Sequence, residues 1–273
     1  MKTGQLSKSI LEADTRQGGN LEPVEIFGIR FPRTTSNALI AELLTRIESG
    51  LGGGICFPDM STMNLVVKDT GLRKCLQKKM EVYNDGAGLG WAARQKGKPF
   101  PDNLNGTDLV PKFLSFVPKG TRVYVVGGRQ RTVNAAVDNM KQQFANVDFV
   151  GWHHGYLDNK EEAELVRDMQ SRRPHIVLVA MGNPLQIRFI ARHKDKPGFD
   201  NSLFLAVGGL LHYFSGELRR APRWMRRYKL EWLFITLQQP YKFKRYFLGI
   251  PRFFYNFYKY EIRSADYRSK VIR

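Results

Sequence analysis

Short apolar segments alternate with helical patterns through most of this chain of 273 residues. Four of the segments are typical of buried strands: RVYVVGG (122–128), VDFVGW (147–152), HIVLVAMG (175–182) and LFLAVGG (203–209). Helical patterns follow three of them, over 131–145, 160–172 and about 184–194. Strands that alternate with helices of about ten to fifteen residues favour a parallel sheet. The pattern therefore predicts an α/β fold with a mostly parallel sheet and flanking helices.

The N-terminal part continues the alternation less regularly. VEIFGIRF (24–31) is typical of one strand, and TSNALIAELLTRIESG (35–50) of a helix that Ser36 caps and Gly50 ends. GGICF (53–57) predicts a short strand and STMNLVVKD (61–69) a helix.

Composition divides the chain into three parts. Polar residues 1–22 predict a flexible arm, 23–210 the α/β core, and 211–273 a basic, aromatic helical appendage. The appendage holds 15 Lys and Arg against 4 Asp and Glu, so it carries most of the net charge of +18. Such an excess suggests a polyanionic partner, either a phosphorylated substrate, a nucleic acid or an anionic membrane.

Within the appendage, YKFKRYFLGIPRFFYNFYKY (241–260) has ten aromatic residues in twenty, interleaved with Lys and Arg. Three interpretations stay open. Basic side chains that snorkel over aromatic rings suit a helix at a membrane interface. The same residues suit stacking on single-stranded nucleic acid. A helical hairpin packed on the core is the third.

Several features point to a cytoplasmic protein. The two cysteines, Cys56 and Cys75, have no metal-binding or redox spacing, as expected in a reducing compartment. The first twenty residues lack the apolar core of a signal peptide. No run of about 18 apolar residues occurs, so we expect any membrane association to be peripheral.

The segment YNDGAGLGW (83–91) puts Asp85 in front of a glycine-rich turn. Gly86, Gly88 and Gly90 form G-x-G-x-G, which differs from the dinucleotide fingerprint G-x-G-x-x-G. The residues leave two interpretations open: a plain Asp-Gly turn, or a carboxylate at the edge of a binding site.

Glycines also end several predicted strands. Gly127-Gly128 and Gly208-Gly209 end two of them, and MGNPLQ (181–186) follows a third. Ligands of open parallel sheets lie beyond the carboxyl ends of the strands, and a helix that begins there can bind phosphate. A simple turn between strand and helix is the alternative. The adjacent His153 and His154 point in opposite directions along an extended chain, so they do not predict a metal site.

Together these motifs have a specific order. The DGxG turn precedes NGTDL (105–109), VVGG, HHGY, MGNPLQ, VGG and RRAPRWMRRYKLEWLFITLQQPYKFKR (219–245). The series resembles the WecG/TagA/CpsF glycosyltransferase family over about residues 24–250. The resemblance implies a Rossmann-like core, an inverting reaction, and transfer of a sugar from a UDP-sugar to a polyprenyl-diphosphate-linked saccharide. It implies no cofactor and no metal, and the sequence has no DxD motif.

The resemblance also implies roles for individual residues. Asp85 takes the position of the general base, which removes the proton of the acceptor hydroxyl. Arg220, Lys242 and Arg245 take basic positions that bind diphosphate. Donor contacts are implied for Phe57, Asp59, Gly86, Gly88, Gly127, Tyr156, Gly182, Asn183, Gln186, Gly208 and Gly209.

Some positions depart from the family pattern. After the predicted strand 53–57, where the family often has an Asn-containing turn, this chain has Phe57-Pro58-Asp59. An additional carboxylate disfavours an acidic uronate donor, so we expect a neutral hexose such as glucose or an N-acetylhexosamine. Asp59 becomes a second candidate base. Asn103 and Ile235 replace family arginines, and His212 replaces an acidic residue.

These observations predict a peripheral glycosyltransferase at the cytoplasmic face of a bacterial inner membrane, active in exopolysaccharide or cell-surface polysaccharide synthesis. The alternative is a basic, noncatalytic nucleic-acid-binding protein, but it leaves the ordered glycine turns unexplained. We expect no nucleic-acid partner. The oligomeric state stays open, a homo-oligomer included.

Overall fold

The structure, a computed structural model, describes residues 21–222, 225, 231–240 and 243–263. Its main sheet has the strand order β4-β3-β8-β7-β5-β6, and every pair of neighbours is parallel. The strands are β3 (Gly53–Cys56), β4 (Glu81–Val82), β5 (Thr121–Gly127), β6 (Val147–His153), β7 (Ile176–Ala180) and β8 (Leu203–Ala206). The predicted α/β fold with a parallel sheet is confirmed.

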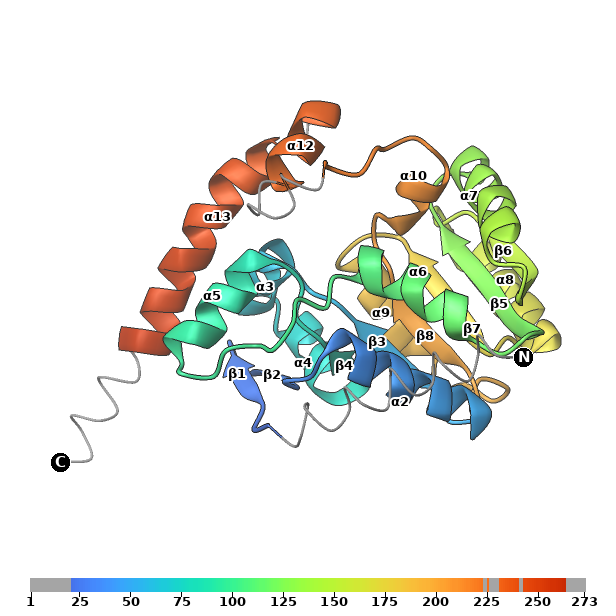
Figure 1. Ribbon diagram of the computed structural model, residues 1–273, viewed down its shortest axis with the longest axis horizontal. Helices are drawn as coiled ribbons and strands as arrows, with labels where there is room; N and C mark the ends of the chain where they lie inside the picture. Colours follow the sequence, from blue (N-terminus) through green and yellow to red (C-terminus); the bar gives the residue numbers. More distant parts are fainter. Residues whose placement is uncertain (1–20, 223–224, 226–230, 241–242, 264–273) are drawn as a thin grey trace.

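Helices cover both faces of the sheet (Figure 1). On one face lie α2 (Ser36–Glu48), α6 (Gly106–Phe116), α7 (Gln130–Gln143) and α10 (Leu210–Phe214). On the other lie α3 (Met60–Lys68), α4 (Thr70–Lys79), α5 (Ala87–Gln95), α8 (Asn159–Arg172) and α9 (Leu185–His193). Along β5, Val123 and Val125 pack on the first layer while Tyr124 and Val126 pack on the second. Burial on both sides explains why the strands are continuous apolar runs.

The segment 24–31 forms a hairpin, so the prediction of one strand was wrong. β1 (Val24–Ile26) pairs antiparallel with β2 (Ile29–Phe31). Between them Phe27 and Gly28 have φ of 51° and 75°. Positive φ at both central residues is typical of the tight turns that join two antiparallel strands. A continuous apolar pattern hides such a turn.

The start of α2 also differs from the prediction. Thr35 is the N-cap, and its side chain accepts a hydrogen bond from the N–H of Ala38. Ser36 is the first helical residue instead. Its N–H donates to the Asp102 carboxylate (3.1 Å). The loop that contains Asp102, 66 residues farther along the chain, therefore contacts the N-terminus of α2.

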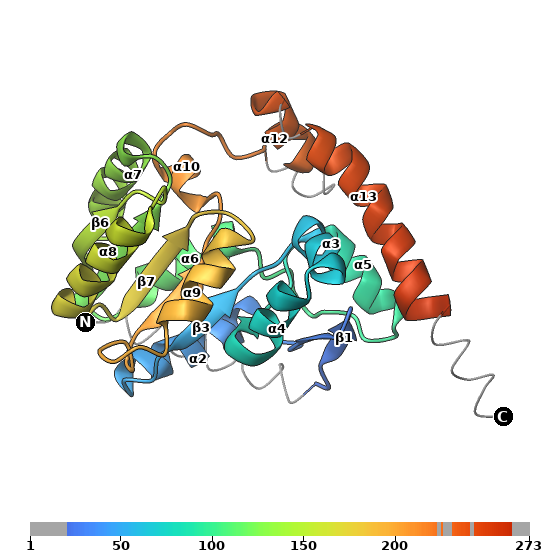
Figure 2. The same cartoon turned by 180° about the vertical axis from the view of Figure 1, so that it is seen from behind.

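The appendage begins within α10 (Leu210–Phe214) and continues to α12 (Glu231–Gln238) and α13 (Phe243–Phe257), followed by a π-helix (Tyr258–Ile262). Figures 1 and 2 show α13 lying along α3 and α5, at the end of the molecule opposite α7 and α8. Phe253 and Phe257 are buried in the core beside Trp91 and Phe27. One face of α13 therefore packs on the core, as the interpretation as a packed helical hairpin requires, and contact of its other face with a membrane stays a prediction.

Polar contacts fix α13 in the same place. Asn64 donates through Nδ2 to the Gly249 carbonyl (2.8 Å), and Asn256 donates through Nδ2 to Asn64 Oδ1 (2.9 Å). Beyond the helix, Glu261 forms an ion pair with Lys96 (2.5 Å). Among the residues that the structure describes, no helix has the length and apolar character needed to cross a bilayer.

Candidate active site

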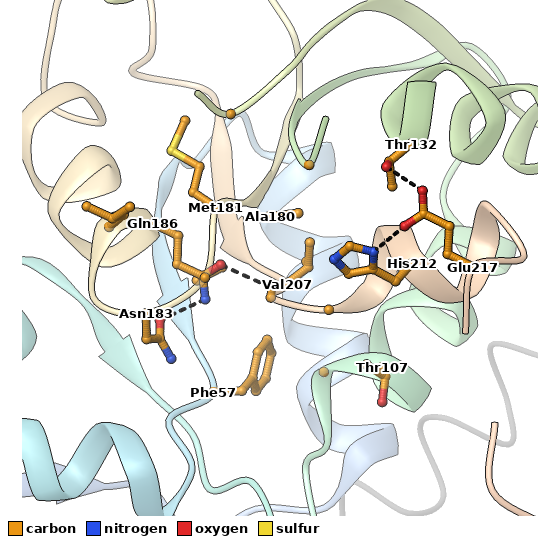
Figure 3. A pocket seen from close by; sticks show the side chains of 18 of the residues that line it. Phe57, Thr107, Thr132, Ala180, Met181, Asn183, Gln186, Val207, His212 and Glu217 are labelled. Carbon is orange, nitrogen blue, oxygen red and sulfur yellow. Dashed lines mark hydrogen bonds and ion pairs between the residues drawn. The ribbon is translucent and has the colours of Figure 1, made fainter. Parts of the chain in front are cut away.

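A cavity of about 600 Å³ opens at the carboxyl ends of the parallel strands. This volume lies within the range of roughly 300–1,000 Å³ that small-molecule sites occupy. Figure 3 shows side chains from several loops gathered around it. The predicted residues that line it are Phe57, Asp59, Asp85, Tyr156, Gly182, Asn183, Gln186, Gly208 and Gly209.

Asp85 lies at one end of the cavity, in the turn between β4 and α5. It is half-buried. Phe57, which follows the neighbouring strand β3, forms part of the wall and is only 7% exposed. The Phe57 ring packs near Tyr83, with centroids 6.2 Å apart, and against Gly106. This end of the cavity therefore combines the Asp85 carboxylate with an apolar wall, and Asp59, two residues after Phe57, adds a second carboxylate to the lining.

Asp59 and the Asn183 loop belong to a hydrogen-bonded network along the cavity. Asp59 caps α3, and its Oδ1 accepts from the N–H (2.9 Å) and the hydroxyl (2.7 Å) of Thr62. Thr62 Oγ1 accepts in turn from Asn183 Nδ2 (2.8 Å). One oxygen of the Asp59 carboxylate is thus engaged in holding a helix end.

Gln186 continues the network to the next strand. It is 3% exposed, and its Nε2 donates to Asn183 Oδ1 (2.8 Å). Its Oε1 accepts from the Gly208 N–H (3.1 Å), as Figure 3 shows. The network joins the loops that follow β3, β7 and β8. It also fixes the orientation of the side-chain amides of Asn183 and Gln186.

Replacing Gln186 with leucine should lower the melting temperature by about 3–10 °C. The variant leaves the Gly208 N–H and Asn183 Oδ1 without these partners, and a buried polar group left unpaired costs roughly 1–3 kcal/mol. Thermal unfolding of the Gln186→Leu variant measures the effect, with the exposed Gln142→Leu as control. Equal melting of both variants would show that the network adds nothing to stability.

The other end of the cavity lies at the start of α7. Gly128, Arg129, Arg131 and Thr132 line it, directly after β5. A helix N-terminus carries partial positive charge, and here two arginines add to it. These groups favour an anion at this end of the cavity, and Glu217 offsets part of their charge because it lies 4.0 Å from Arg131 Nε.

A histidine and a carboxylate meet beside this helix start. His212 Nδ1 is 2.7 Å from Glu217 Oε2, and Thr132 Oγ1 donates to Glu217 Oε1 (2.6 Å). Figure 3 shows both interactions, with the opposite edge of the His212 ring turned toward the cavity beside Val207. Burial raises the pKa of Glu217, but hydrogen bonds from Thr132 and His212 outweigh it and keep the pKa below its ordinary value. The anionic Glu217 therefore orients the imidazole.

Three predicted glycines do not line the cavity: Gly86, Gly88 and Gly127. Two of them are needed for close packing. A Cβ on Gly88 would lie 2.0 Å from Met60 Sδ, and one on Gly127 would lie 2.4 Å from the Ala180 carbonyl oxygen. Gly88 thus lets α5 pack closely against Met60, and Gly127 lets the end of β5 lie against β7.

The predicted basic residues of the appendage are distributed differently. Arg220 donates to Thr107 Oγ1 (2.8 Å), pairs with Asp108, and lies over the Tyr213 ring. Thr107 lines the cavity, so Arg220 joins the start of the appendage to its rim. Lys242 lies outside the described residues. Arg245 lies in α13, and its side chain is outside what the structure describes.

Sequence reasoning did not select several residues that line the cavity: Thr107, Arg129, Arg131, Thr132, Glu217 and Gln239. The two arginines had a usable signal, since GGRQR puts basic residues directly after a strand that ends in glycines. Glu217 and Gln239 had no such signal in the sequence, because they belong to the appendage and reach the cavity only through the fold. In the described part of the chain, no group of three or more His, Cys, Asp or Glu residues could hold a metal ion.

The chain is similar to one known protein family and to several individual proteins. Residues 24–267 match the model of the glycosyl transferase WecG/TagA/CpsF family. A relative from Bacillus spizizenii is 30% identical over 185 residues, which cover 67% of this chain and 70% of that protein. One from Staphylococcus aureus is 25% identical over 243 residues, covering 88% and 94%.

Both relatives carry the name N-acetylglucosaminyldiphosphoundecaprenol N-acetyl-beta-D-mannosaminyltransferase. The match of the family model spans the parallel sheet, the cavity at its carboxyl edge and the packed helix α13. The resemblance noted in the sequence is thus confirmed, and the chain belongs to the WecG/TagA/CpsF glycosyltransferase family.

Proposed function

We propose that this protein is an inverting glycosyltransferase that moves a sugar from a UDP-sugar to a polyprenyl-diphosphate-linked saccharide. The observation that carries the proposal is one cavity with a carboxylate at one end and a cationic helix start at the other. The names of the relatives support a lipid-diphosphate acceptor. They also favour an N-acetylhexosamine donor over glucose, in agreement with the expectation of a neutral sugar. The product would enter the synthesis of an exopolysaccharide or another cell-surface polysaccharide.

The strand order suggests how a donor would lie. From β4, which precedes Asp85, to β5, which precedes Arg129, there are four inter-strand steps. At about 4.8 Å each, these steps span roughly 19 Å. An extended sugar nucleotide has a comparable length. Its nucleotide and diphosphate would occupy the α7 end, beside Arg129 and Arg131, and its sugar the Asp85 end.

The chemistry needs a single base. Asp85 would accept the proton of the acceptor hydroxyl as its oxygen attacks the anomeric carbon from the face opposite UDP. The bond between that carbon and the phosphate oxygen breaks, and UDP leaves with the electron pair. UDP is a stable anion and needs no proton. Positive charge at the α7 end would stabilise it as it departs.

This proposal predicts that UDP stabilises the protein without a divalent metal. At a UDP concentration about 100 times the Kd, mass action adds about 2.7 kcal/mol, or about 5–10 °C in melting temperature. A thermal-shift measurement with UDP and UDP-N-acetylhexosamines, in EDTA, would detect it. No shift with any of them would overturn the UDP assignment, and a shift that requires Mg²⁺ or Mn²⁺ would overturn metal independence.

A matched pair of variants locates the UDP site in the same measurement. Arg129→Ala should reduce the shift because it removes a cation at the proposed diphosphate position. The exposed Arg30→Ala, on the distant β1-β2 hairpin, removes the same charge and should leave the shift unchanged. Equal shifts in the two variants would place the diphosphate elsewhere.

We further propose that the protein binds the cytoplasmic face of the inner membrane peripherally through α13. Its outward face carries Phe247, Leu248 and Tyr255, each more than 60% exposed. Membership in a glycosyltransferase family leaves the nucleic-acid-binding alternative with only the basic charge and the aromatic segment 241–260 in its favour. A homo-oligomer stays a prediction.

A further inference from the structure

One short segment holds the Asp85 turn from both sides. Before Asp85, Asn84 Nδ2 donates to the Asp102 carbonyl (2.9 Å). After it, the Gly86 N–H donates to Asn103 Oδ1 (2.7 Å). Asn84 is only 2% exposed, so its side chain is buried on the donor side of the first contact, whereas Asp102 and Asn103 lie at the surface. The backbone on either side of Asp85 is thereby tied to two consecutive residues, Asp102 and Asn103.

The segment is itself anchored. Asp102 Oδ1 accepts from the Asn103 N–H (2.8 Å), which orients the loop. Asp102 Oδ2 accepts from the N–H of Ser36 (3.1 Å) and from its hydroxyl. A carboxylate at a helix N-terminus is favourable. The Asp85 turn is therefore connected, through Asp102 and Asn103, to the first residue of α2.

Asn103 is not part of the cavity wall. It lines a separate pocket of about 210 Å³, together with Ser36, Asp102 and Lys112. Asp85 lines the large cavity and not this smaller pocket. Asn103 reaches the Asp85 turn directly through its hydrogen bond with Gly86, and its own loop continues to Gly106 and Thr107 on the cavity wall.

We propose that Asn103 is a positioning residue for Asp85, holding the turn that aims the carboxylate into the cavity. This inference rests on the proposed function, in which Asp85 is the general base. A base must lie within hydrogen-bond reach of the hydroxyl that it deprotonates. A displacement of about 1 Å costs up to about 10²-fold in rate. The hydrogen bond from Gly86 to Asn103 limits such a displacement.

The test compares three variants for turnover, donor KM and UDP affinity. Asn103→Ala removes the oxygen that accepts the hydrogen bond from the Gly86 N–H. It should lower kcat by about 10-fold or more, because the Asp85 carboxylate is no longer held in the orientation that the reaction needs. UDP affinity and donor KM should stay within about 2-fold, because the α7 end is untouched. The exposed Asn201→Ala, at the amino edge of β8, is the control and should behave as the unmodified protein. The donor is the UDP-sugar with the largest thermal shift, and UDP alone serves for calorimetry.

Asn103→Asp provides a rescue that a merely structural role would not explain. It keeps an oxygen acceptor for the Gly86 N–H, so kcat at high pH should recover to within about 3-fold. The new negative charge beside the turn disfavours ionisation of Asp85, so the acid limb of the pH profile should move to higher pH. Recovery of kcat together with an acid limb that moves to higher pH supports the positioning role of Asn103. An unshifted limb, or loss of kcat equal to that of Asn103→Ala, would overturn it.

Asp85→Asn separates this inference from the function on which it rests. If Asp85→Asn is inactive while Asn103→Ala turns over normally, the positioning role fails and the proposed function stands. If Asp85→Asn turns over normally, the base assignment fails, and the role of Asn103 with it. In the Asp85→Asn background, Asn103→Ala should lower the residual turnover no further, because both changes act through one carboxylate. An additional full loss would contradict the proposal.

Discussion

Asp85→Asn should lower turnover by about 10²-fold or more while the affinity for UDP stays within about 2-fold. Asparagine has nearly the shape of aspartate but cannot accept the proton of the acceptor hydroxyl, and general-base catalysis typically contributes about 10²–10⁴-fold. UDP release in a steady-state assay measures turnover, and calorimetry with UDP measures binding. The melting temperature should change little, since the side chain is half-buried at the cavity edge.

Asp59→Asn is the matched control for this experiment. Asparagine also caps helices well and keeps an oxygen for the contacts with Thr62. We therefore expect α3 to stay intact and turnover to fall much less than in Asp85→Asn. If Asp59→Asn were the inactive variant and Asp85→Asn were active, the base would be Asp59.

Serine substitutions on the outward face of α13 should weaken binding to anionic vesicles by at least about 100-fold. Phe247, Leu248 and Tyr255 are each more than 60% exposed, and burying a large apolar side chain contributes about 1.5–3 kcal/mol. The measurement is sedimentation of the triple variant with vesicles of phosphatidylglycerol and phosphatidylethanolamine. Removing the whole of α13 would be a poorer test, because Phe253 and Phe257 belong to the core.

The control replaces exposed apolar residues elsewhere. Leu51 and Leu65 are 58% and 40% exposed and lie outside the appendage. The Leu51→Ser, Leu65→Ser variant should bind vesicles as the unmodified protein does. Added salt should partly weaken vesicle binding by this control variant and by the unmodified protein, because the basic residues of the appendage contribute an electrostatic attraction. Equal vesicle binding by the triple variant and the control would remove α13 from the membrane contact.

The parallel sheet could be predicted from local sequence because each central strand is a continuous apolar run. Val123 to Val126 are buried on both sides, so their pattern needs no knowledge of partners. The 24–31 hairpin could not be separated from one strand in the same way. Its turn depends on positive φ at Phe27 and Gly28, and phenylalanine gives no signal for that conformation. The N-cap of α2 was ambiguous because Thr35 and Ser36 are both good caps.

The location of the cavity also followed from sequence, since glycines that end parallel strands meet at one edge of the sheet. The hydrogen-bond partners of each side chain in the cavity did not follow from the sequence. Gln186 contacts Asn183 nearby in sequence, but it also contacts Gly208, which follows another strand. Glu217 and Thr132 lie 85 residues apart. Contacts of this kind depend on strand order, and no local pattern reports strand order.

The sequence by itself determined the fold class, the family and the choice of Asp85 as the carboxylate to test. The fold class depends on periodicity along the chain. The family and the choice of Asp85 depend on the resemblance that the order of the short motifs carries. Only the tertiary structure decided that Gly88 is a packing residue, that Arg220 binds the rim at Thr107, and that Asn103 holds the Asp85 turn. Each of these roles comes from an atom brought near by folding, so it depends on distances that residue spacing does not contain.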